Sequence, residues 1–113
     1  MAVADRLELT PQEVKDLQQS GKPLSLLDVR EPAEWALAKI EGSILIPVGS
    51  VPANLQQIEM KADEGPVIVY CHHGVRSLQV VSWLRERGVT GCYSMTGGID
   101  RWSREIDSNT PVY

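Results

Sequence analysis

The stretch VIVYCHHGVRS, residues 67–77, is the part of the sequence that most strongly predicts the fold. Its first four residues, Val67–Tyr70, are apolar at every position, which is typical of a strand that helices cover on both faces. A helical pattern follows from residue 77 to residue 87, and its apolar face is predicted to consist of Leu78, Val81 and Leu84. A buried strand that leads through a short loop into a helix predicts an α/β fold with this strand near the centre of a parallel sheet.

Strands and helices alternate along the rest of the chain. The capping box Thr10-Pro11-Gln12-Glu13 opens a helix that is predicted to extend to about Gln19. Gly97-Gly98 is expected to form a tight turn before the last helix. The other predicted strands are residues 24–29, 43–47 and 92–95, and the other predicted helices begin at residue 31, span 50–59 and span 98–105. We therefore predict one α/β domain, residues 1–113, with a mostly parallel central sheet flanked by helices on both faces.

The composition argues against several classes of function. The 113 residues include 15 acidic and 11 basic side chains, and residues 1–70 alone carry 11 acidic and 6 basic ones. A net charge of -4 is unfavourable for general nucleic-acid binding, which needs a basic face. Met1–Leu9 lacks the apolar core of a targeting signal, and the longest apolar runs, residues 44–46 and 67–71, are too short to span a bilayer. We expect a cytoplasmic protein without a nucleic-acid or membrane partner.

Four features meet in the loop after the apolar strand. Cys71 stands where the strand ends, which is the side of a parallel sheet at which ligands bind. Gly74 permits the backbone angles that turn N–H groups toward one centre, and the helix that follows adds partial positive charge there. Arg76 supplies a guanidinium, and the loop contains no carboxylate to neutralise it. These conditions favour a nucleophilic thiolate or a bound anion, whereas the alternative is a small buried apolar cysteine.

These residues resemble those of a known family. Cys71-x-x-Gly74-x-Arg76-Ser77 after an apolar strand resembles the active-site loop of rhodanese-like sulfurtransferases. Leu-Asp-Val-Arg-Glu at residues 27–31, with Glu34-Trp35 downstream, is similar to the N-terminal motif of that family, and residues 96–102 are similar to its C-terminal motif. The three motifs stand in the family's order and span nearly the whole chain, so the sequence resembles a complete single-domain rhodanese. One departure is Lys39, which stands where the family commonly has His.

The resemblance implies a sulfurtransferase that acts through a persulfide. The Cys71 thiolate would attack the sulfane sulfur of a small anionic donor such as thiosulfate, and the persulfide would then pass its sulfur to an acceptor, cyanide or a thiol. Arg76 would attract the donor and stabilise the leaving group. Asp28 and Arg30 are predicted to support the loop as a charge pair, with a solvated salt bridge as the alternative. The residues predicted to form the active-site loop and bind substrate are His72, His73, Gly74, Val75, Arg76 and Ser77.

Two further functions remain open. The ending Ile106-Asp107-x-x-x-Pro111-x-Tyr113 resembles that of rhodanese domains fused to adenylating enzymes, which favours a sulfur-relay module that hands its sulfur to a carrier protein. Phosphatases and arsenate reductases of this fold have one more residue between the cysteine and the arginine of the loop. Here four residues, His72 to Val75, intervene, which matches the shorter loop of sulfurtransferases.

The two histidines and the second cysteine each have two possible roles. His72 and His73 either donate protons or only add polar character to the rim of the site. Because adjacent residues on a tight loop project in different directions, and no further cluster stands at ligand spacing, we expect no metal and no cofactor. Cys92 is expected to be a buried structural residue rather than a thiol that resolves Cys71.

Overall fold

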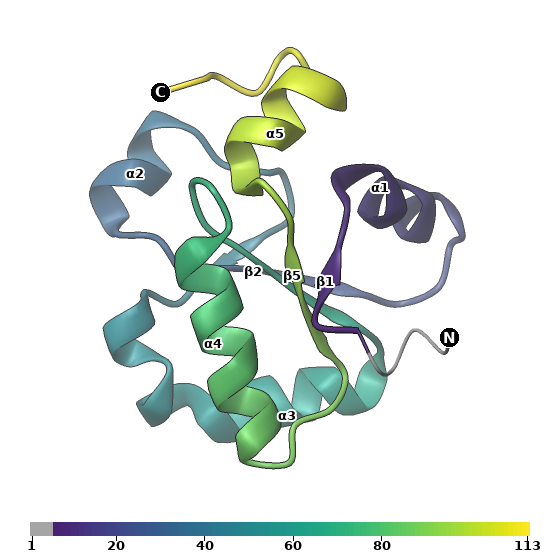
Figure 1. Cartoon of the computed structure of the whole chain (residues 1–113), viewed down its shortest axis with the longest axis vertical. Coiled ribbons are helices and arrows are strands. Elements are labelled where there is room, and N and C mark those ends of the chain that lie inside the picture. Colours follow the sequence, from purple (N-terminus) through teal and green to yellow (C-terminus); the bar gives the residue numbers. More distant parts are fainter. Residues whose placement is uncertain (1–5) are drawn as a thin grey trace.

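The fold is organised around a five-stranded parallel sheet (Figure 1). The structure is a computed structural model and describes residues 6–113. The strand order is β1-β5-β4-β2-β3, and each neighbouring pair is parallel, which confirms the predicted fold class. The apolar strand β4 is the central one. The strands are β1 (Glu8–Leu9), β2 (Ser25–Asp28), β3 (Ile44–Leu45), β4 (Val67–Tyr70) and β5 (Cys92–Met95).

Helices cover both faces of the sheet. Alternate residues of β4 enter two separate cores, because Val67 and Val69 pack on one face and Ile68 and Tyr70 on the other. Buried side chains of α3 and α4 complete the first core, and buried side chains of α1 and α5 complete the second. The helices are α1 (Pro11–Gln19), α2 (Pro32–Leu37), α3 (Leu55–Glu64), α4 (Val75–Glu86) and α5 (Gly98–Glu105).

Some elements differ from those predicted. The short edge strand β1 was not predicted, because its two residues form a strand only by pairing with β5. The helix expected over residues 50–59 is a pair of 3-10 turns, residues 48–50 and 52–54, followed by α3, which begins only at Leu55. Pro52 starts the second turn, because a residue without an N–H is tolerated at a first helical position. The buried face of α4 also differs, because Leu78 is only half-buried and the buried residues are Ser77, Val80, Val81 and Leu84.

The loops that follow β4 and β5 meet at the carboxyl edge of the sheet. Figure 1 shows the loop after β4 beside the start of α5, at the end of the molecule where the C-terminal segment also lies. Within residues 6–113, none of the helices combines the length and apolar character needed to cross a membrane. The expectation about a targeting signal falls largely on residues 1–5, which lie outside the described residues.

Candidate functional site

Backbone N–H groups surround the sulfur of Cys71. This residue directly follows β4 and is only 1% exposed. The N–H groups of Gly74 and Ser77 donate to Sγ at 3.1 and 3.4 Å. Gly74 has a φ of +101°, a conformation that favours glycine, and this conformation turns the loop back over the sulfur. The structure thus brings together Cys71, Gly74 and Ser77 in the predicted anion nest.

A buried hydroxyl pair lies next to the same sulfur. The Ser77 hydroxyl accepts from the Cys71 thiol at 3.5 Å and shares a 2.7 Å hydrogen bond with the Ser94 hydroxyl on β5. Both serines are fully buried. Ser94 was not predicted as a site residue, because a serine within a short strand carries no sequence signal for such a contact. If Cys71 ionises, the Ser77 hydroxyl can reorient and donate to the thiolate.

The start of α5 holds the outer side of the loop. The N–H groups of Ile99 and Asp100 donate to the carbonyl oxygens of Cys71 and His72 at 2.9 and 3.1 Å. Gly98 makes this approach feasible, since a Cβ there would collide with both carbonyl oxygens. Because the carbonyl groups bond to α5, the N–H groups on the inner side of the loop remain directed at the sulfur. The predicted tight Gly97-Gly98 turn is confirmed, with φ values of +73° and +59°.

Arg76 is not the unpaired cation that the sequence suggested. Its Nη1 and Nη2 donate to Oε1 and Oε2 of Glu34 at 2.7 and 2.9 Å, so the two side chains form a bidentate ion pair. The hydrogen bonds from Arg76 lower the pKa of Glu34 to about 2. The loop itself contains no carboxylate, but α2 supplies one from the other side of the site. The family motif around Glu34-Trp35 was the only sequence signal for this residue.

Tyr113 joins several parts of the site. Its hydroxyl donates to Oε2 of Glu34 at 2.7 Å and accepts from Nη1 of Arg30 at 2.8 Å. Its ring stacks on the His72 ring with centroids 4.0 Å apart and planes 7° from parallel, and its backbone oxygen lies 2.8 Å from Nε2 of His72. Burial, with the Glu34 carboxylate, raises the pKa of Tyr113 to about 12, so its hydroxyl stays protonated near neutral pH. Tyr113 was not predicted as a site residue.

Asp28 and Arg30 form a fully buried ion pair. Nη2 of Arg30 donates to Oδ2 of Asp28 at 2.6 Å, and neither side chain has exposed surface. The same nitrogen donates to the carbonyl oxygen of Ala38 at 2.6 Å. The alternative of a solvated salt bridge is therefore wrong. Arg30 also contacts Tyr113, which in turn contacts the carboxylate that pairs with Arg76, and a supporting role of the ion pair for the loop stays a prediction.

An acidic residue of α5, Asp100, lies near the two histidines. His73 is exposed, and its Nδ1 lies 4.0 Å from Oδ2 of Asp100 on α5. Atoms suitable for a metal, one each from His72, His73 and Asp100, lie within 4.8 Å of one another, a grouping that the spacing along the sequence did not reveal. However, Nε of Arg104 lies 3.2 Å from the same Asp100 oxygen and lowers the pKa of that carboxyl. This cation opposes metal binding at the trio.

Cys92 lies in the core on β5. Its side chain has no exposed surface, its thiol donates to the carbonyl oxygen of Val89 at 3.3 Å, and burial raises its pKa. Both cysteines are free. A protonated thiol inside an apolar core fits the predicted structural role of Cys92.

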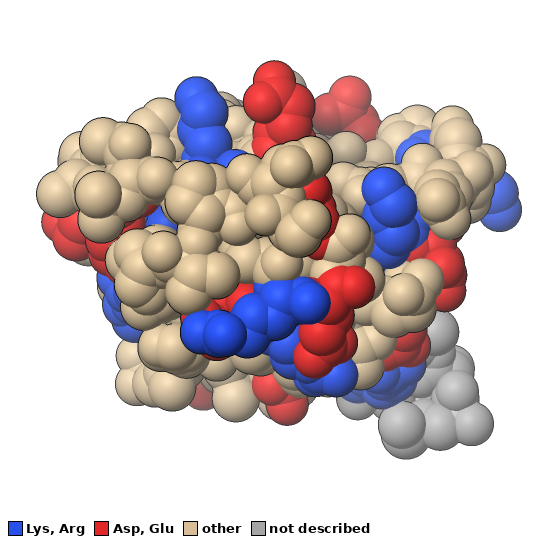
Figure 2. All heavy atoms as spheres, turned by 90° about the horizontal axis from the view of Figure 1, so that it is seen from above, with Lys and Arg blue, Asp and Glu red and all other residues tan. Residues whose placement is uncertain are grey.

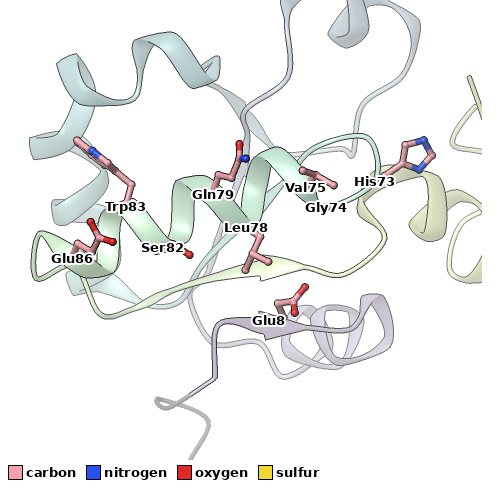
Figure 3. A pocket seen from close by; sticks show the side chains of 9 residues that line it. All are labelled: Glu8, His73, Gly74, Val75, Leu78, Gln79, Ser82, Trp83 and Glu86. Atoms are coloured by element: carbon pink, nitrogen blue, oxygen red, sulfur yellow. The ribbon is translucent and has the colours of Figure 1, made fainter.

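A surface groove runs along α4 from the loop of residues 71–77, which is called the active loop below because it is the candidate active site (Figure 3). Its volume is about 740 Å³. His73 and Val75 line one end, Trp83 and Glu86 line the other, and Glu8 of β1 contributes from the opposite side. Val75 is one of the exposed apolar side chains, which leaves an apolar surface directly beside the loop. Of the predicted loop residues, Gly74 and Ser77 bond to the sulfur, and His73, Gly74 and Val75 line this groove. His72 and Arg76 do neither, because they contact Tyr113 and Glu34 instead.

Comparisons with known proteins place the chain in one family. The model of the rhodanese-like domain matches residues 10–105. Thiosulfate sulfurtransferase GlpE of Haemophilus influenzae is 35% identical over 97 residues, which are 86% of this chain and 88% of GlpE. The probable adenylyltransferase/sulfurtransferase MoeZ of Mycobacterium tuberculosis is 31% identical over 105 residues, which are 93% of this chain. This chain spans only 26% of the length of MoeZ.

Solved structures agree with these matches. The crystal structure of a rhodanese-like domain protein from Staphylococcus aureus superposes with a TM-score of 0.77 at 29% identity, covering 94% of this chain and 97% of that one. The parallel sheet and the cysteine-containing loop at its carboxyl edge therefore occur in a sequence that matches one family over most of its length. The chain belongs to the rhodanese-like domain family.

Proposed function

We propose that this protein is a rhodanese-type sulfurtransferase, which moves a sulfane sulfur from a donor to a thiophilic acceptor through a persulfide on Cys71. The observation that carries the proposal is the pair of N–H groups, from Gly74 and Ser77, that donate to Sγ. A group of donors around a buried sulfur stabilises either a thiolate or the terminal sulfur anion of a persulfide. The relative GlpE, which is named a thiosulfate sulfurtransferase, supports the same activity.

The first step loads the sulfur. The Cys71 thiolate attacks the sulfane sulfur of a donor such as thiosulfate, a new S–S bond forms, and the old S–S bond breaks with its electron pair leaving on sulfite. The product is a Cys71 persulfide anion. The N–H groups of Gly74 and Ser77 would stabilise its charge, with the Ser77–Ser94 hydroxyl pair next to it.

The second step unloads the sulfur. A thiolate or cyanide attacks the outer sulfur of the persulfide, and the electron pair of the S–S bond returns to Cys71, which regenerates the thiolate. The outer rim that an acceptor meets carries His73 and Val75, both of which line the groove along α4. A thiol acceptor must lose its proton, and His73, whose Nδ1 lies 4.0 Å from Oδ2 of Asp100, would take it.

The proposal is tested by mass spectrometry of the intact protein after incubation with thiosulfate. We expect one sulfur atom to be added, to map to Cys71, and to be lost on treatment with a thiol. Cys71→Ser should abolish both the added sulfur and thiocyanate formation from thiosulfate and cyanide. Cys92→Ser is the matched control and should retain both. Activity that persists in Cys71→Ser, or phosphate-ester hydrolysis with no added sulfur, would contradict the proposal.

A second candidate is a sulfur relay to a carrier protein. It is favoured by the relative MoeZ, whose name combines an adenylyltransferase with a sulfurtransferase. The groove beside the loop offers space for a peptide of such a carrier. Transfer of labelled sulfur from the loaded protein to an adenylated carrier C terminus, faster than to a free thiol, would favour the relay. Equal or slower transfer would favour a small-molecule acceptor.

A further inference from the structure

Formal charges beside the active loop cancel one another. The network of buried and half-buried groups contains two guanidiniums, Arg30 and Arg76, and two carboxylates, Asp28 and Glu34. Tyr113 connects the two ion pairs through hydrogen bonds of its neutral hydroxyl. Figure 2 shows the face of the molecule at the carboxyl edge of the sheet. On this face, Lys and Arg side chains lie next to Asp and Glu side chains and do not form one broad basic area. A small anion that approaches the site therefore meets a nearly neutral surface.

We propose that Glu34, held in place by Tyr113, determines the class of donor by masking the charge of Arg76. The site then favours sulfane-sulfur donors of low negative charge, such as thiol-borne persulfides and thiosulfonate monoanions, over the thiosulfate dianion. This inference rests on the proposed sulfurtransferase function and names the donor class of the same site. It differs from the sequence-based expectation, in which Arg76 attracts an anionic donor.

The geometry of the ion pair explains why the mask is strong. Both terminal nitrogens of Arg76 are occupied by the two oxygens of Glu34, so the guanidinium has no terminal nitrogen pair left to grip a sulfonate group. The side chains of Arg76 and Glu34 are 35% and 20% exposed, so solvent screens the pair only in part. To bind the end-on pair of N–H groups of Arg76, a donor would have to displace a carboxylate that also accepts a hydrogen bond from Tyr113.

The remaining attraction for an anion comes from the backbone. The N–H groups of Gly74 and Ser77 point at one sulfur atom, and they carry partial rather than full charges. Such a nest is matched to the single charge on a thiolate or persulfide sulfur. It does not compensate the second charge of a dianion that approaches a thiolate, and the mutual repulsion of these like charges then raises KM.

The decisive measurement compares two donors that share a tetrahedral frame and differ by one charge. Thiosulfate and methanethiosulfonate both give their sulfane sulfur to the Cys71 thiolate, and the leaving groups are sulfite and methanesulfinate. Each departs with the electron pair of the broken S–S bond, so both reactions yield the same persulfide. The ratio of the two KM values in one variant cancels effects that the substitution has on both donors alike, such as a change in the reactivity of Cys71.

We expect Glu34→Gln to lower the KM for thiosulfate about tenfold relative to that for methanethiosulfonate, because the variant leaves the charge of Arg76 uncompensated. The thiosulfate KM of this variant should also rise more steeply with ionic strength than that of the unmodified protein. Glutamine retains the acceptor that bonds to the N–H of Glu31 at the start of α2, so the helix should persist. A merely structural role of Glu34 would change the KM for both donors alike.

Two further variants complete the test. Tyr113→Phe removes the hydrogen bond to Glu34 but keeps the ring on His72, and it should shift the KM ratio in the same direction by a smaller factor. Glu13→Gln is the matched control, because Glu13 forms an equally short two-pronged pair with Arg6, which does not belong to the loop. It should leave the ratio unchanged.

The outcomes separate this inference from the proposed function. If neither donor adds sulfur to Cys71 in the unmodified protein, the sulfurtransferase proposal fails. If both donors load Cys71 but Glu34→Gln has the same KM ratio as the unmodified protein, the proposed mask is overturned while the sulfurtransferase function stands.

Discussion

Arg30 combines a permanent charge with complete burial, so its energetics depend on its partners. Its guanidinium bonds to Asp28, to the carbonyl oxygen of Ala38 and to the hydroxyl of Tyr113. A buried ion pair of this kind adds little net stability over apolar residues, but the loss of one partner is costly because the other charge stays buried. We therefore expect the pair to position Tyr113 rather than to add net stability to the core.

Asp28→Asn should lower the free energy of unfolding by about 3 kcal/mol, since it leaves the buried guanidinium of Arg30 without a countercharge. Urea denaturation measures the change. Arg6→Met, which breaks the partly exposed pair with Glu13, is the comparison and should lower the free energy of unfolding by much less. Equal losses in the two variants would show that burial of the Asp28–Arg30 pair has no special cost.

At the scale of elements, the start of α5 acts as a brace for the loop after β4. Two N–H groups of this helix bond to the carbonyl oxygens of Cys71 and His72. The brace requires a residue without a side chain at position 98, both for the backbone angle and for the close approach of the loop. Helix and loop therefore form one unit, although residues 75–97, which include α4 and β5, separate them along the chain.

Gly98→Ala is expected to destabilise the protein by about 2 kcal/mol or more and to slow sulfur loading, because its Cβ forces the loop carbonyls away. Gly88→Ala is the matched control, since Gly88 also has positive φ but nothing lies within 4 Å of the added Cβ. It should cost only the backbone strain, about 1 kcal/mol, with normal loading. Thermal unfolding and the single-turnover rate of loading are the measurements. Normal loading in Gly98→Ala would contradict the brace.

For the whole molecule, the ion pair between Glu34 and Arg76 links stability to pH. The folded state holds the pKa of Glu34 at about 2, below its ordinary value of 4.5. The stabilisation is fully present above about pH 4.5 and is lost as pH falls toward 2, because the carboxylate must then be protonated. The contribution is on the order of 1 to 3 kcal/mol at neutral pH.

Glu34→Gln should accordingly have a lower free energy of unfolding than the unmodified protein at neutral pH. The difference between the two proteins should shrink as pH falls from about 4.5 to about 2. Urea midpoints measured across this range test the expectation. Glu59→Gln alters an exposed carboxylate with no ion-pair partner within residues 6–113, and its stability curve should run parallel to that of the unmodified protein. A deficit of Glu34→Gln that stays constant with pH would contradict the linkage.

The sequence by itself determined the features that depend on neighbours along the chain. The apolar run Val67–Tyr70 predicted the central strand, the capping box predicted α1, and the spacing of Cys71, Gly74 and Ser77 predicted the nest around the sulfur. These features follow from local propensity and backbone angles, which a short window of sequence contains. The extent of the domain, residues 1–113, stays a prediction.

Only the tertiary structure decided the partners of the charged and aromatic groups. Glu34 and Arg76 are 42 residues apart, and Glu34 and Tyr113 are 79 apart, yet they form one network. The sequence therefore suggested a cationic site, whereas the folded chain has a nearly neutral one. The physical reason is that an ion pair depends on distance in space and not on separation along the chain. The crossover connections between the parallel strands bring α2, the active loop and Tyr113 to the same edge of the sheet.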